Sequence, residues 1–73
     1  MAQISHEIGK RIRAFRKSRH MTLEEMARIL CKNKSTLSKY ETGENDIPTQ
    51  ILIKLAEYYN TTTDYLLGRT DEP

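Results

Sequence analysis

A group of amine and hydroxyl side chains lies in the middle of this 73-residue chain, at the spacing of one face of a helix. Its members, which follow Asn33, are Lys34, Ser35, Ser38, Lys39 and Thr42. Amines and hydroxyls are donors that suit phosphate oxygens and purine edges, and an α-helix fits the major groove of duplex DNA. A surface helix of this composition can also be merely solvated, so the neighbouring elements decide between the two interpretations.

Just before this group, a short helix with a well-defined start is predicted. Thr22 and Glu25 have the spacing of a capping box, which places the helix start at Thr22, and Met21 and Met26 are spaced to form a hydrophobic staple. The helix is expected to end near Cys31. Its inward stripe at helical spacing is Leu23, Met26, Ala27 and Leu30.

A second short helix follows after a tight turn. Asn33 is a good N-cap for it, and its inner side carries Leu37, Tyr40 and Glu41. Two helices joined in this way have the layout of a helix-turn-helix, whose second helix enters the major groove. In this context, DNA contact becomes the favoured interpretation of the polar face.

Over residues 6–68 the chain resembles the Cro and phage-repressor (XRE-like) helix-turn-helix family of bacteria and phages. The resemblance rests on ordered positions: Arg16, Glu41 and Gly43, with the runs TLEEMA (residues 22–27), STLS (35–38), LAE (55–57) and DYLL (64–67). It implies an all-α, compact, lambda-repressor-like domain of five helices in which the third, about residues 33–42, reads the major groove. It also implies a homodimer on a palindromic operator in double-stranded DNA.

With this resemblance, specific residues are expected to touch DNA. We assign the major groove to the recognition helix, through Asn33, Lys34, Ser35, Ser38 and Lys39. Many relatives have a phosphate-binding Gln where Leu23 stands. We expect that contact either to be absent or to be replaced by Thr22 or the helix N-terminal amides. The loop after Gly43 carries Glu44 and Asp46 in place of bases, which argues against a phosphate contact there.

The first helix is predicted to be capped by Ser5 and slightly weakened by Gly9. Its apolar stripe is Ile4, Ile8, Ile12 and Phe15. Arg16 lies beside this stripe, where a half-buried charge needs a partner, and Glu41 is the candidate for a bidentate pair with a structural role. The family has a matching pair at these positions. The sequence does not show which of the remaining bases contact phosphate and which are only solvated. These bases are Lys10, Arg11, Arg13, Lys17 and Arg19.

Two further helices complete the expected domain of residues 1–68, which a short flexible tail of residues 69–73 follows. One helix covers about residues 49–59, with core candidates Ile51, Leu52, Leu55, Ala56 and Tyr59. The last begins after Thr62 as N-cap, has Asp64 in its first turn and stops at Gly68. In the family this region supplies the dimer contact, so Tyr65 and Leu66 are interface candidates, with simple core packing as the open alternative.

The turn of the helix-turn-helix departs from the family pattern at Cys31, where relatives usually have Gly. Either the turn tolerates a strained Cys or it uses another geometry. A redox switch there is conceivable, whereas a buried or semi-buried thiol is the commoner outcome for a lone Cys.

Composition narrows the function classes. Residues 1–39 hold ten Lys or Arg against three acids, whereas residues 40–73 hold two bases against seven acids, so a polyanion would be attracted to the first half. With one Cys and no apolar run of membrane length, a cytoplasmic location without disulfides is expected. His6 and His20 are not spaced as metal ligands with Cys31, and no nucleophile motif or phosphate-binding glycine loop occurs. We expect no enzyme, no metal, no cofactor and no small-molecule site.

The sequence thus predicts a sequence-specific DNA-binding transcriptional regulator, acting as a repressor. Two alternatives stay open. An antitoxin-type autoregulator would need a protein partner, and a protein-interaction module with this fold would have lost DNA contact, because fold alone does not determine function.

Overall fold

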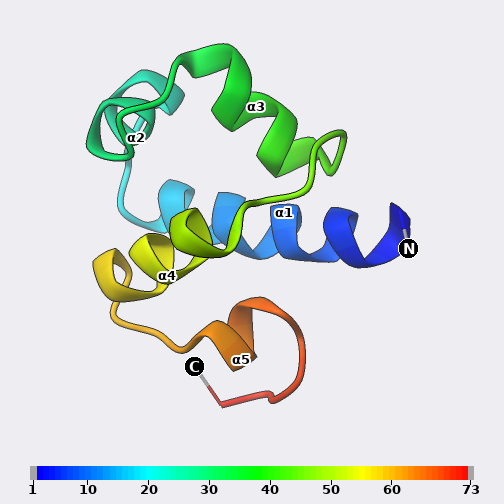
Figure 1. The fold of residues 1–73 in the computed structure, drawn as a ribbon. Coiled ribbons are helices and arrows are strands. Elements are labelled where there is room, and N and C mark those ends of the chain that lie inside the picture. Colours follow the sequence, from blue (N-terminus) through cyan, green and yellow to red (C-terminus); the bar gives the residue numbers. More distant parts are fainter. Residues whose placement is uncertain (1, 73) are drawn as a thin grey trace.

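Five helices make up the computed structural model, which describes the backbone of residues 2–72 and the side chains of residues 6–72. They are α1 (Ala2–Ser18), α2 (Leu23–Ile29), α3 (Lys34–Thr42), α4 (Thr49–Tyr58) and α5 (Thr63–Leu66). No strand occurs among residues 2–72, so the predicted all-α, five-helix fold is confirmed. α1 runs through the middle of the molecule, with α2 and α3 on one side of it and α4 and α5 on the other (Figure 1).

Side-chain caps start three of the helices, as the sequence predicts. The Thr22 hydroxyl accepts from the Glu25 amide at 3.1 Å while the Glu25 carboxylate accepts from the Thr22 amide at 2.8 Å, which completes the capping box of α2. Because backbone and hydroxyl donors of Thr22 favour the charged carboxylate, the pKa of Glu25 is lowered. Asn33 accepts from the Thr36 amide at 2.7 Å, and Thr62 accepts from the Tyr65 amide at 3.0 Å.

Every helix is followed by a residue in the left-handed region, although only two of these residues are glycines. The φ angles are 56° for His20, 58° for Cys31, 83° for Gly43, 55° for Asn60 and 78° for Gly68. After α2, the Cys31 amide donates to the Arg28 carbonyl at 3.1 Å and the Lys32 amide donates to the Ala27 carbonyl at 2.8 Å. This is a Schellman ending, and it costs a non-glycine residue about 1–2 kcal/mol.

Cys31 thus occupies the strained position that the sequence left as one of two alternatives. Its thiol is free and exposed rather than buried or semi-buried, so that expectation was wrong. The reason is geometric, because the Schellman ending turns the chain away from the core at the residue after the helix.

The core collects the inward stripes of the helices. All four residues of the predicted α2 stripe contribute, with Leu23 half-buried, and the five core candidates of α4 and its C-terminus are all buried. The buried apolar side chains are Ile12, Met26, Ala27, Leu30, Leu37, Tyr40, Ile51, Leu52, Leu55, Ala56, Tyr59 and Leu66.

The start of α1 differs from the sequence prediction. The helix begins at Ala2, so Ser5 is its fourth residue and is not the N-cap. The Ile4 and Ser5 side chains lie outside the described residues, whereas Ile12 is buried and Ile8 and Phe15 are half-buried. Arg19, one of the bases that the sequence left unassigned, donates to the Tyr59 carbonyl at 3.1 Å, and its guanidinium lies 5.0 Å from the Tyr59 ring centre. Burial, with the charge of Glu41 as a smaller cause, raises the pKa of Tyr59 to about 12.

The last helix corrects one of the two interface candidates. Leu66 is 0% exposed and belongs to the core, so it offers no surface to a second subunit. Of the four residues of α5, Leu66 is the one whose side chain is buried. Tyr65 is half-buried, with its ring edge-to-face on Phe15 at 5.9 Å.

Gly9 permits the close crossing of α1 and α3. A Cβ atom at this position would overlap the Glu41 carbonyl oxygen and would lie 2.6 Å from the Tyr40 carbonyl oxygen. Both obstacles are backbone atoms at the end of α3, which cannot rotate away. The glycine that the sequence marks as a small loss of helix propensity is therefore required by packing.

We expect Gly9→Ala to lower the free energy of unfolding by about 1–3 kcal/mol, because overpacking outweighs the better helix propensity of alanine. Urea unfolding followed by circular dichroism measures this. Ala14→Gly, at an exposed position of the same helix, is the control and should lose only about 0.5–1 kcal/mol. A Gly9→Ala protein as stable as the parent would contradict the packing role.

Candidate nucleic-acid interface

The outer face of α3 presents the predicted donors to solvent. Lys34, Ser35 and Lys39 are exposed and Ser38 is half-buried, while Leu37, Tyr40 and Glu41 on the inner face are buried. The amphipathic division expected from the sequence is thus present. The structure brings the four donors together along one side of a single rigid helix, which is a geometry suited to a groove of DNA.

The N-cap residues of α2 and α3 are Thr22 and Asn33. The Asn33 side chain uses its carbonyl oxygen to cap α3, so its amide nitrogen is the part able to donate to an outside acceptor. The Thr22 hydroxyl accepts from the Glu25 amide, and its own proton can turn either to the Glu25 carboxylate or to an outside acceptor. Both residues are exposed. Each can therefore cap its helix and donate to a phosphate or base at the same time.

Lys39 has a nearby carboxylate. Its Nζ lies 3.9 Å from Glu44 Oε2, and the two side chains are 49% and 65% exposed. A contact of this length between solvated groups contributes little stability, so Lys39 can leave Glu44 without much cost. Glu44, which departs from the family pattern, therefore contributes little to holding the fold.

Beneath α3, Arg16 and Glu41 form the bidentate ion pair that the sequence predicts. Arg16 Nε donates to Glu41 Oε2 at 2.7 Å and Arg16 Nη2 donates to Oε1 at 3.1 Å, with the side chains only 10% and 6% exposed. The hydrogen bond to Glu41 raises the pKa of Arg16 against the opposing effect of burial.

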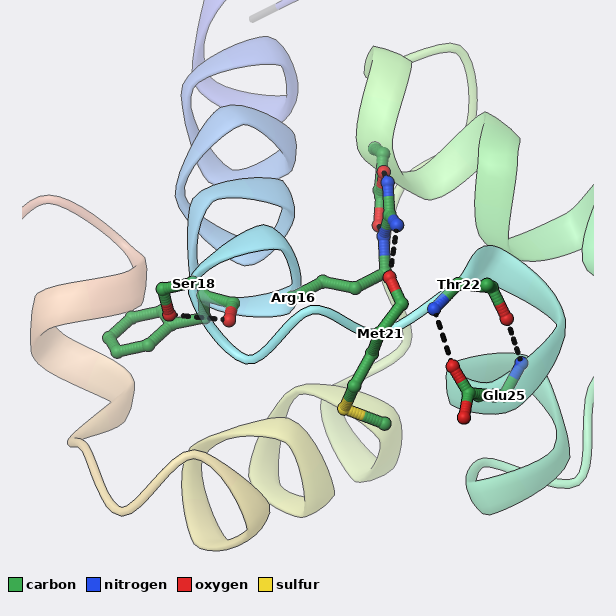
Figure 2. Close-up of polar contacts among 7 residues, drawn as sticks. Arg16, Ser18, Met21, Thr22 and Glu25 are labelled. Carbon is green, nitrogen blue, oxygen red and sulfur yellow. Dashed lines mark hydrogen bonds and ion pairs between the residues drawn. The ribbon is translucent and has the colours of Figure 1, made fainter.

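The third donor group of the same guanidinium fixes the start of the helix-turn-helix. Arg16 Nη1 donates to the Met21 carbonyl at 2.7 Å, directly before the capping box of Thr22 and Glu25 (Figure 2). One side chain from α1 therefore holds both α3 and the entry to α2. This contact to Met21 was not visible in the sequence, because a backbone carbonyl carries no residue-specific signal.

Two surface grooves were also missed by sequence reasoning. One, of about 350 Å³, lies between α1 and α3, and Lys10, Arg13, Ser38 and Thr42 contribute to its lining. The other, of about 410 Å³, lies between α1 and α5 beside Phe15 and Tyr65. The sequence left Lys10 and Arg13 unassigned and did not show which neighbouring helix they face.

Other classes of site were searched among the same residues. No group of three or more His, Cys, Asp or Glu that could hold a metal ion occurs within the described part of the chain. None of the helices found in residues 2–72 is long and apolar enough to cross a membrane.

A family model described as helix-turn-helix matches residues 12–66 of the chain. This span contains the whole of α2 and α3, the Arg16–Glu41 pair and the α4–α5 segment that completes the core. The chain belongs to this helix-turn-helix family, in agreement with its resemblance to XRE-like regulators.

Two curated relatives from Bacillus subtilis (strain 168) extend the comparison. The chain is 39% identical over 64 residues to the HTH-type transcriptional regulator ImmR, and this alignment covers 88% of this chain and 50% of ImmR. It is 36% identical over 64 residues to the uncharacterized HTH-type transcriptional regulator YobD, covering 88% of this chain and 57% of that protein. The chain thus spans about half the length of these relatives.

Solved structures show the same fold at low sequence identity. The clp gene regulator ClgR from C. glutamicum has a TM-score of 0.77 at 22% identity, covering 88% of this chain and 83% of that one. The DNA-binding domain of BldD from S. venezulae has a TM-score of 0.74 at 21% identity, covering 88% of this chain and 96% of that one.

We expect Glu41→Ala to lower the free energy of unfolding by about 3 kcal/mol or more, since it leaves the Arg16 charge buried without a partner. Urea unfolding of this variant measures the loss. The coupling between the two residues is measured by the same experiment on Arg16→Met, Glu41→Leu and the double variant that combines them. The double variant should be much more stable than either single variant, because two apolar side chains of similar size leave no unpaired charge. A Glu41→Ala protein within 1 kcal/mol of the parent would contradict the structural role.

Proposed function

We propose that this protein is a sequence-specific double-stranded DNA-binding transcriptional regulator that acts as a repressor through α3. The observation that carries the proposal is the row of donors on the outer face of α3, held on a helix-turn-helix by the buried Arg16–Glu41 pair. Membership of the helix-turn-helix family and relatives named as transcriptional regulators support it. The repressor assignment follows the resemblance to Cro and phage repressors.

In this proposal the donors divide by position. Lys34, Ser35, Ser38 and Lys39 on the outer face of α3 contact base edges, while Asn33 at its N-terminus lies at the entrance to the groove and donates through its free amide nitrogen. Thr22 donates to a phosphate from the start of α2, where the helix N-terminal amides add positive potential. Since the DNA of a bacterium or phage is in the cytoplasm, we place its action there.

The proposed functional unit is a homodimer on a palindromic operator. One helix with four or five donors discriminates by about 1–3 kcal/mol per good base contact, which is too little from one protomer to select one site in a genome. With Leu66 in the core, Tyr65 remains the interface candidate, beside the groove of about 410 Å³ between α1 and α5.

A second candidate function is an antitoxin-type autoregulator. The chain is 31% identical over 61 residues to the antitoxin PezA of Streptococcus pneumoniae, and this alignment covers 84% of this chain and 39% of PezA. DNA contact through α3 would be common to both functions, so the two differ in whether a toxin also binds. Coexpression with the neighbouring gene product and rescue of growth would distinguish them.

We expect Lys39→Ala to weaken binding to a selected duplex by about 1–3 kcal/mol while leaving the melting temperature nearly unchanged, since Lys39 reads a base and its contact to Glu44 is weak. Fluorescence anisotropy with a duplex selected from a random pool measures this. The matched control is Lys54→Ala on α4, across α1 from α3 (Figure 1). Equal binding by Lys39→Ala and the parent would show that the reading face is assigned wrongly.

The same titrations, repeated at increasing salt, test the class of partner. If a dimer makes six or more phosphate contacts, affinity should fall by about 10³-fold or more between low and moderately high salt. Affinity that stays flat over this range would favour a protein-interaction module over a DNA-binding one.

Sedimentation of the protein with the selected duplex tests the dimer. We expect two protomers per palindromic site, with recognition helices about 34 Å apart, because half-sites are then one turn of B-DNA apart. Tyr65→Ala should weaken assembly on DNA without exposing the core, since Tyr65 is only half-buried. One protomer on a non-repeated site would rule out the dimer.

A further inference from the structure

The groove between α1 and α3 has polar walls of two kinds. Lys10 and Arg13 contribute from α1, and the hydroxyl residues Ser38 and Thr42 contribute from α3. Its volume of about 350 Å³ is large enough for several waters or for one polar group of a ligand. The Lys10 amine, the Arg13 guanidinium and the Ser38 hydroxyl can donate, whereas the Thr42 hydroxyl already donates to the Lys39 carbonyl at 3.3 Å. The lining therefore favours an acceptor that carries negative charge.

The net charge of the groove lining is positive. Its one carboxylate is Glu41, and both oxygens of that carboxylate already accept from Arg16, at 2.7 and 3.1 Å. That pair is neutral as a unit, which leaves Lys10 and Arg13 uncompensated within the groove. Lys10 Nζ lies 3.8 Å from Glu7 Oε1, but both side chains are more than half exposed, so the contact is weak.

Of the three Lys or Arg side chains that line the groove, Arg13 has the fewest competing contacts. Among the described residues, it makes no ion pair and no hydrogen bond, and it is exposed. Arg11, two residues earlier, lies instead at the end of α5. A side chain at Gly68 would bring its Cβ atom within 3.3 Å of the Arg11 guanidinium. Arg19 packs on Tyr59. The structure therefore shows that Arg13 lines the groove while Arg11 and Arg19 lie elsewhere, which the sequence did not show.

The groove adjoins the proposed reading face. Lys34, Ser38 and Thr42 are four residues apart, so they form one line along α3, and the last two of them line the groove. A helix seated in the major groove has a sugar-phosphate backbone on either side of it. The α1 wall of the groove would then face one of these backbones while α3 reads bases.

We propose that the groove between α1 and α3 holds a phosphodiester of the DNA backbone, with Arg13 as its principal donor and Lys10 beside it. This inference rests on the proposed function. It adds α1 to the DNA-binding surface, and it gives Arg13 and Lys10 a role in affinity and register, because a backbone contact carries no base information of its own.

The test compares salt dependence across charge-matched variants. Arg13→Gln and Lys10→Gln should each reduce the slope of log affinity against log salt by about 1, which corresponds to roughly fivefold weaker binding at about 0.15 M salt. The sequence preference should stay the same. Lys54→Gln, which removes one positive charge from α4 on the other side of α1, should leave the slope nearly unchanged.

Duplexes that carry single methylphosphonate linkages locate the contact. At one linkage the parent should lose affinity by about the same factor as Arg13→Gln, and Arg13→Gln should lose nothing further there. Additive losses at every linkage would overturn the proposal. It would also be overturned if Arg13→Gln behaved like Lys54→Gln while the parent still bound duplex DNA, and this result would leave the proposed function standing.

Two other outcomes are decisive. If the parent binds no duplex, the proposed function and this inference both fail. A free phosphate ion has the same chemistry as a phosphodiester of DNA. Titration with inorganic phosphate alone, monitored by the NMR signals of the Arg13 guanidinium, tests whether the groove binds such an ion. Saturable phosphate binding in the groove, with the salt slope of Arg13→Gln equal to that of the parent, would assign it to a free anion and overturn the DNA contact.

Discussion

The buried Arg16–Glu41 pair is the interaction on which the helix-turn-helix depends. Its guanidinium joins α1 to α3 through both carboxylate oxygens and reaches the Met21 carbonyl before α2, at 2.7 Å. α2 and α3 have seven and nine residues, and helices this short are not stable alone. Their mutual angle is fixed by tertiary contacts, and a planar fork of donors with one geometry is suited to that task.

The rest of the domain keeps these helices short and close together. Side-chain caps begin α2, α3 and α5, and left-handed residues end every helix, even where Cys31 or Asn60 must adopt a conformation that favours glycine. Gly9 lets α1 approach the carbonyls at the end of α3. Each device is local, but together they hold the outer face of α3 on a rigid support, which is what discrimination between base edges requires.

The charge distribution has the same logic. The acidic second half of the chain supplies the Glu41 that neutralises Arg16, and it places Glu44 beside Lys39. Next to α3, Lys10 has only its weak, exposed contact to Glu7, and Arg13 makes no ion pair among the described residues. A polyanion would therefore meet positive charge from two helices, next to the proposed base-reading side chains of α3. Affinity and sequence discrimination would then come from different residues of one surface.

The sequence by itself determined the helices, their caps and the polar face of α3, because these depend on interactions within three or four residues of one another, as in the capping box of Thr22 and Glu25. It also indicated the Arg16–Glu41 pair, since a charge beside an apolar stripe needs a partner. It mistook Ser5 for a cap, and it left Leu66 and Cys31 undecided. Only the tertiary structure placed Leu66 in the core, exposed Cys31 and turned Arg13 toward α3 and Arg19 onto Tyr59. The direction a side chain faces depends on which helix packs beside it, and that is a contact between residues far apart in the chain.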